Sequence, residues 1–267
     1  MTPALQKRKN TGPGNIGWSF PVFTFDIVPA MATKPRPTPI WYRYTFTLDD
    51  GRTRTFEVNL DPDTLNIIPP QDQTPPQWAR LDYSSCEHCT LPPGTVYCPI
   101  ASNIGPIVDV FSDVLSFRTA DVTVETAERK YQKTGPVQDA LFALLGIYMS
   151  ASGCPSMEKL KPMVRHHLPF ASVDETIYRV LSMYVTAQYL RMQSGLQPDW
   201  QLTELAETYD RINQVNHEFC QRLAKAAKED ALVNALVILD AFGTLVKMPN
   251  PRGNEKLRKM FATYLTP

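Results

Sequence analysis

The chain has 267 residues, of which 43% are hydrophobic and 20% are charged. This length can bury a sizeable core, and the composition is typical of an ordinary soluble protein rather than a disordered one. Basic and acidic residues both number 27, so net charge gives no reason to expect binding to nucleic acid or to an anionic membrane. No apolar run is long enough to predict a membrane-spanning helix.

The first 38 residues are rich in proline, lysine and threonine, and we expect them to form a disordered tail. A basic start followed by an apolar stretch loosely imitates a signal peptide. However, Pro21, Asp26 and Pro29 interrupt the apolar part, so we favour another interpretation. Met31 is then the native start, and residues 1–30 are an upstream extension.

Residues 40–48 and 52–60 alternate between apolar and polar side chains, which predicts two strands. The register selects the turn between them. A three-residue loop at 49–51 with a left-handed Gly51 pairs Tyr44 with Phe56 and keeps the apolar side chains on one face. A third short strand is expected at 64–69. The proline-rich stretch 69–106 that follows has few periodic signals, so something must hold it in place.

Helical patterns dominate from about residue 107, although residues 120–126 fit a strand or an extended link. Pro136 is suited to the first turn of a helix, and Ser172 with Glu175 forms a capping-box pattern. The predicted helices cover 107–117, 136–151, 173–193, 200–227, 230–246 and 254–265, with 230–246 as the central one. The fold class is therefore α+β. A small N-terminal antiparallel sheet with a cysteine-bearing loop (39–110) precedes a bundle of about five helices (111–267).

Three of the five cysteines lie close together in the proline-rich stretch, at Cys86, Cys89 and Cys98. The first two form a Cys-x-x-Cys pair, which lets two sulfurs reach one metal ion, and Pro92-Pro93-Gly94 turns the chain toward the third. An odd number of cysteines excludes a fully paired disulfide framework within one chain. Close spacing of this kind in a non-secreted protein favours metal binding in a reducing cytosol.

Cys154 is the leading candidate for the fourth ligand, because it lies at the expected end of a helix and can reach the loop. A closed site made of Cys86, Cys89, Cys98 and Cys154 would hold a structural Zn²⁺ and join the loop to the helices. Cys98 and Cys154 are each followed by proline, as in some cluster-binding loops, so an iron–sulfur cluster is the rival cofactor.

Three histidines are the other possible ligands. His88 lies between the first two cysteines, where a side chain usually points away from the ion. His166 and His167 lie between two prolines, and adjacent helical residues diverge by about 100°, so they cannot both face one site. One of them could be a ligand or a general base, but we favour a histidine that bonds to backbone.

The remaining polar candidates favour structural roles. Cys220 lies beside the apolar stripe of 200–227 and is expected to be a buried core thiol. Asn234 and Asp240 interrupt an apolar helix and would need partners, which the arginines at 165, 179 or 222 could supply. No phosphate-binding loop, nucleophile elbow or HExxH motif is present.

The four cysteines together with the segment 167–175, HLPFASVDE, resemble a family of bacterial proteins of similar length that have a domain of unknown function. The resemblance covers residues from about 40 to the end. It implies a bacterial cytosolic setting and no particular activity.

The sequence therefore favours a cytoplasmic, non-catalytic zinc protein that acts as an interaction or regulatory component with a protein partner. An iron–sulfur or cysteine-based redox sensor is the first alternative. A metalloenzyme with His166 or His167 beside the metal is the second.

Overall fold

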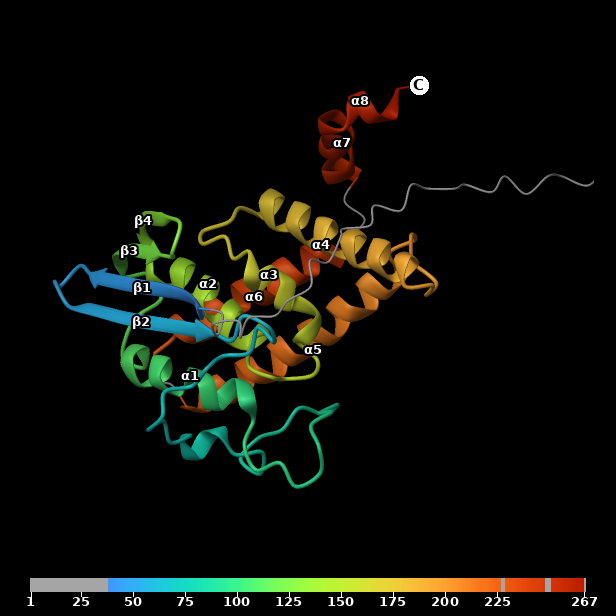
Figure 1. Ribbon diagram of the computed structural model, residues 1–267. Helices are drawn as coiled ribbons and strands as arrows, with labels where there is room; N and C mark the ends of the chain where they lie inside the picture. Colours follow the sequence, from blue (N-terminus) through green and yellow to red (C-terminus); the bar gives the residue numbers. More distant parts are fainter. Residues whose placement is uncertain (1–37, 227–228, 248–250, 267) are drawn as a thin grey trace, which may run out of the picture. The chain divides into compact units, whose positions relative to one another are not determined.

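The computed structural model describes residues 38–226, 229–247 and 251–266, with side chains omitted at 247 and 251–254. The expected disordered tail and the expected native start at Met31 concern residues 1–37 and lie outside this range. Residues from Thr38 onward form one unit (Figure 1). Its elements are β1 (Ile40–Leu48), β2 (Thr53–Leu60), η1 (Gln77–Ala79), α1 (Pro99–Phe111), β3 (Thr119–Glu125), β4 (Lys130–Pro136), α2 (Val137–Ser150), η2 (Glu158–Leu160), α3 (Lys161–Arg165), α4 (Val173–Gln193), α5 (Thr203–Ala226), α6 (Ala231–Lys247), α7 (Pro251–Met260) and α8 (Ala262–Leu265).

The four strands form one antiparallel sheet in the order β2-β1-β3-β4. The predicted hairpin register is confirmed: Tyr44 pairs with Phe56, and Gly51 takes a φ of +82° in a loop that Leu48 and Arg52 close with a backbone bond of 2.9 Å. The α+β class is also confirmed. Two of its strands, β3 and β4, come from residues 119–136. The expected boundary near residue 110 therefore separates strands that belong to one sheet.

The apolar face of the sheet is buried against the helices. Phe111 at the end of α1 contacts Phe46 and Phe56, with ring centroids 5.1 and 5.6 Å away. On the other side of the core, α6 packs against α2 and α5 and also contacts α1 and α4, which confirms its central position. The buried sheet residues are Tyr42, Tyr44, Phe46, Leu48, Phe56, Val58, Leu60, Ala120, Val122 and Val124.

Two local expectations are wrong. The stretch 64–69 is not a strand, because Asp61 Oδ1 binds the backbone N–H groups of Asp63 and Thr64 in a turn. The N–H of Ile67 then donates to the carbonyl of Ala151 at the end of α2, 2.9 Å away. The first helix begins at 99 rather than 107, since a proline at its first position suits a helix start.

The helices predicted over 136–151, 173–193, 200–227 and 230–246 hold to within a few residues, whereas the one predicted over 254–265 is two helices, α7 and α8. The capping box is confirmed: Ser172 Oγ accepts from the N–H of Glu175, and the Glu175 carboxylate accepts from the N–H of Ser172. Pro136 is the N-cap of α2 rather than its first residue.

Candidate functional site

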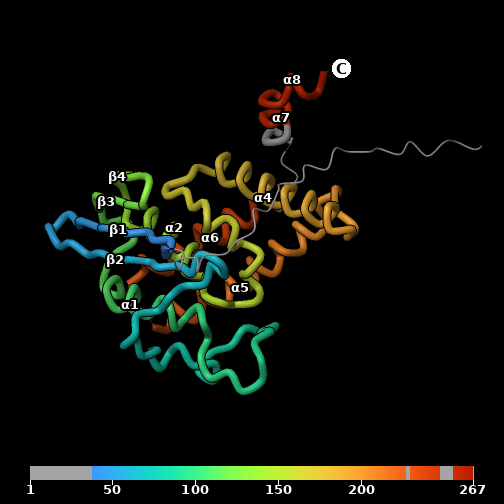
Figure 2. Tube along the Cα trace, in the orientation of Figure 1, coloured from blue at the N-terminus to red at the C-terminus, as the bar shows by residue number. Residues whose placement is uncertain are grey.

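The segment between β2 and α1 carries three cysteines and has little regular structure, apart from η1 (Figure 2). Two backbone bonds join the middle of this segment to its C-terminal end: Cys98 N–H donates to the Ala79 carbonyl at 2.8 Å, and Leu81 N–H to the Val96 carbonyl at 2.9 Å. The guanidinium of Arg222 on α5 donates to the carbonyls of Trp78 and Arg80 at 2.8 and 3.1 Å. These bonds fix the base of the loop against α5, and residues 82–95 project beyond them.

The four cysteines predicted as ligands surround one small cavity of about 30 Å³, which we call the cysteine cavity. Cys86, Cys89 and Cys98 come from the loop, and Cys154 comes from the turn after α2. Cys98 is the N-cap of α1 and is buried, whereas Cys89 is exposed. None of the chain's cysteines forms a disulfide.

The local backbone explains how each thiol reaches the cavity. The N–H of Cys89 bonds to the Cys86 carbonyl at 3.1 Å, which is the tight turn that a Cys-x-x-Cys pair requires. Gly153 has a φ of +88°, a value that suits glycine, and it turns the chain sharply after α2. Cys154 then points toward the loop, with its N–H bonded to Ser152 Oγ at 3.1 Å.

The thiols lie close enough to affect one another's ionisation. Burial, a hydrogen bond to Glu218 and the charges of Glu218, Cys98 and Cys154 together raise the pKa of Cys86 to about 12. Burial also raises the pKa of Cys154, and the charges of Cys98 and Cys89 add to the shift. These shifts keep Cys86 and Cys154 as neutral thiols, and a cation beside them would favour the thiolates, because each negative charge disfavours the next.

This donor set fits a soft or borderline cation such as Zn²⁺ or an iron–sulfur cluster. Throughout the described ranges, however, no three His, Cys, Asp or Glu side chains lie at metal-binding spacing. Binding would therefore require the thiols to move closer together.

Two charged residues of α5 belong to the cavity wall, and the sequence did not indicate them as site residues. Glu218 accepts from the backbone N–H of Glu87 at 2.9 Å and bonds to Cys86. Arg222 is 3% exposed and contributes a fixed positive charge beside the thiols. Both lie more than a hundred positions from the loop in sequence, so no local spacing could have indicated them.

The histidines occupy different places. His88 lines the cysteine cavity, whereas His166 and His167 line a separate open cleft. His167 Nε2 lies 2.5 Å from the hydroxyl of Tyr44 on β1, so this histidine bonds to a side chain rather than to backbone as expected. Burial, with a smaller effect from the charge of Arg179, lowers the pKa of His167 to about 3.

Among the described residues, Asn234 and Asp240 of α6 do not pair with arginine, contrary to the expectation. Asn234 Nδ2 donates to Ser116 Oγ and to Asp230 Oδ2, at 3.0 and 2.8 Å. Asp240 Oδ1 is buried and has no hydrogen-bond partner among the described residues. Cys220 is partly buried against the core, and its sulfur lies 3.6 Å from the carbonyl of Val233, outside the cysteine cavity.

The fold and the site define an α+β protein in which a cysteine-bearing loop from the sheet side meets the helices at a thiol-lined cavity. The chain belongs to the DUF6901 family, a domain of unknown function whose family model matches residues 40–262. No curated protein and no solved structure matches the sequence. In the described part of the chain, no helix has the length and apolar character needed to cross a membrane.

Proposed function

We propose that this protein binds a structural zinc ion through Cys86, Cys89, Cys98 and Cys154, and that it acts as an interaction or regulatory component in a reducing cytosol. The observation that carries the proposal is the meeting of all four thiols, from two segments far apart in sequence, around one cavity. A metal bound there would connect the loop to the turn after α2. The protein's residues supply the sulfur ligands, and Arg222 offsets part of the negative charge that they accumulate.

The regulatory or interaction role draws support from the surface of α4. Tyr178, Val185, Tyr189 and Met192 are all more than a third exposed, and their spacing places them along one side of the helix. Exposed apolar side chains gathered on one helix face are typical of protein-binding surfaces. We therefore propose a protein partner, and nothing in the cysteine cavity requires a reaction.

Metal analysis of protein purified without oxygen tests the proposal. We expect about one equivalent of zinc per chain, lost in Cys154→Ser and retained in the matched control Cys220→Ser. Replacing zinc by Co²⁺ adds a spectroscopic readout, because the thiolate absorption of the cobalt protein reports how many sulfurs are bound. Protein that contains no metal would overturn the proposal, and so would equal zinc content in the two variants.

The same preparation separates the alternatives. Iron and inorganic sulfide with visible colour would establish the iron–sulfur protein, which the Cys-Pro steps at Cys98 and Cys154 favour. A metalloenzyme with His166 or His167 at the metal has less support, because those histidines line a different cleft. Loss of zinc from His167→Gln but not from Cys154→Ser would favour that enzyme.

A further inference from the structure

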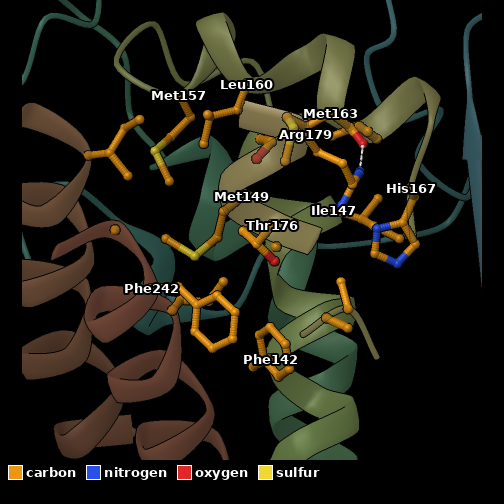
Figure 3. Close-up of a pocket in the computed structure, with 18 of the residues that line it drawn as sticks. Phe142, Ile147, Met149, Met157, Leu160, Met163, His167, Thr176, Arg179 and Phe242 are labelled. Carbon is orange, nitrogen blue, oxygen red and sulfur yellow. Dashed lines mark hydrogen bonds between the residues drawn. The ribbon is translucent and has the colours of Figure 1, made fainter. Parts of the chain in front are cut away.

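A second cavity, of about 140 Å³, lies between the helices and is separate from the cysteine cavity. Five helices, α2 to α6, contribute to its wall, which is mostly apolar. Figure 3 shows Phe142 and Phe242 side by side at one end, with Met149, Met157 and Met163 along the wall. The two rings are stacked, with centroids 5.3 Å apart. We call this space the apolar cavity.

The size of the apolar cavity sets the size of its occupant. A cavity of about 150 Å³ lined by leucine, isoleucine and phenylalanine stays dry and binds benzene, so a space of this volume holds an apolar body of about six carbons. Three methionines in the wall make it adaptable, since their unbranched side chains can rearrange around aromatic or aliphatic groups. The volume is too small for a long lipid chain.

The guanidinium of Arg179 lies at the polar end of the apolar cavity. Arg179 on α4 donates through Nη2 to the carbonyls of Met163 and His166, at 2.9 and 2.7 Å (Figure 3 draws the first bond). These bonds leave Nε and Nη1 for another acceptor. Within the described ranges, Arg179 forms no ion pair with a carboxylate. The charge of the nearby Glu175 acts on Arg179, but this carboxylate is hydrogen-bonded to Ser172 in the capping box. A partly buried guanidinium without an ion-pair partner is a site that an anionic ligand would stabilise.

A second polar atom also lacks a partner. Asn216 on α5 is 3% exposed and lines the apolar cavity, and its Oδ1 has no hydrogen-bond partner among the described residues. Buried amide oxygens are normally bonded, so this atom indicates an occupant that brings a donor, either a ligand hydroxyl or a water molecule that accompanies the ligand.

The structure also provides a route of access. An open cleft beside β1 shares His167, Leu168 and Arg179 with the apolar cavity. Arg129 and Arg165 line this cleft and are exposed, so its charge attracts an anion toward Arg179. Glu128 is the acidic residue that lines it. A ligand would therefore bind with its apolar body in the apolar cavity and its negative group toward the cleft.

We infer that the apolar cavity binds a small organic carboxylate with an apolar body of about six carbons, aromatic or aliphatic, and that Arg179 holds the carboxylate. The site is independent of the proposed metal. A small molecule bound there would let the protein respond to a metabolite, which the proposed metal site does not provide.

The test is a titration with benzoate and hexanoate, and with neutral benzene, followed through the NMR signals of methionine methyl groups. Saturable shifts are expected at the methyl signals of Met149, Met157 and Met163, which each Met→Leu variant assigns. Arg179→Gln should weaken benzoate binding about tenfold or more and leave benzene binding unchanged. Benzene binding thus shows that the variant retains the folded cavity.

The matched control is Arg165→Gln, which removes a cation from the cleft and none from the apolar cavity. It should change benzoate affinity by less than threefold, because its effect is long-range and screened. Filling the space with Ala143→Met should abolish binding of all three probes. Three results would overturn the inference: no saturable shift with any probe, equal affinity for benzoate and benzene, or equal losses in the two arginine variants.

Discussion

The buried contact between His167 and Tyr44 makes a quantitative prediction about pH. Because burial lowers the pKa of His167 from 6.5 to about 3, the unfolded chain binds a proton on this residue over a pH range where the folded protein does not. The contribution to stability is complete above the unfolded pKa and is lost as the pH falls from about 6.5 toward 3. Acid therefore destabilises the fold through this group.

The magnitude follows from the two pKa values. Between about pH 7 and about pH 5, the free energy of unfolding should fall by about 2 kcal/mol through His167 alone. This change in free energy is an upper limit, since solvent still reaches part of the His167 side chain. The Tyr44 hydroxyl, whose pKa burial raises well above 10, stays protonated throughout and continues to bond to the neutral ring.

Urea unfolding at the two pH values, on wild type and His167→Gln, measures this effect. The variant cannot titrate at this position, so its stability should change by about 2 kcal/mol less between the two conditions. The neighbouring His166 is exposed, and His166→Gln is the matched control that should keep the wild-type pH dependence. Equal pH dependence in His167→Gln and wild type would refute the reasoning.

Three further substitutions test the packing. Ser172→Ala removes the capping box and should lower the free energy of unfolding by about 1 kcal/mol, measured by urea denaturation. A Cβ on Gly243 would clash with Asn213 Oδ1, so in Gly243→Ala the Asn213 side chain must move and lose its 3.1 Å bond to Thr244 Oγ1. The substitution should destabilise by about 1 kcal/mol, and adding Asn213→Ala should recover the loss in a double-mutant cycle. Additive effects would contradict that contact. Asp230→Ala leaves the buried N–H of Ser116 unbonded and should lower the melting temperature, at a cost of about 1–3 kcal/mol; an unchanged value would contradict it.

The sequence predicted those helices and strands that bury one face, because their apolar residues recur with a regular period. The hairpin of β1 and β2 alternates strictly, and only one register keeps Tyr44 and Phe56 on the buried face, so both the strands and the turn could be worked out. By contrast, β4 is an edge strand with mostly exposed polar residues and carries no alternation to detect. The early start of α1 was missed because residues 99–106 were assigned to the proline-rich stretch, whose last proline, Pro106, lies inside the helix.

In the candidate sites, too, local features could be predicted from the sequence and long-range contacts could not. Spacing alone indicated Cys86, Cys89 and Cys98, and the turn after α2 indicated Cys154, because each is a local feature. Glu218 belongs to the site only because α5 packs against the loop. The apolar cavity has no sequence signature, since its wall is shared among five helices whose apolar stripes look like ordinary core.

One helix borders both cavities. Asn216 of α5 lines the apolar cavity, and Glu218 lines the cysteine cavity. Two positions along an α-helix are about 200° apart around its axis, so these side chains leave opposite sides of α5. A rotation of α5 that moves Glu218 toward the thiols moves Asn216 the other way. The two side chains are therefore linked mechanically through one helix, although no residue of the described ranges lines both cavities.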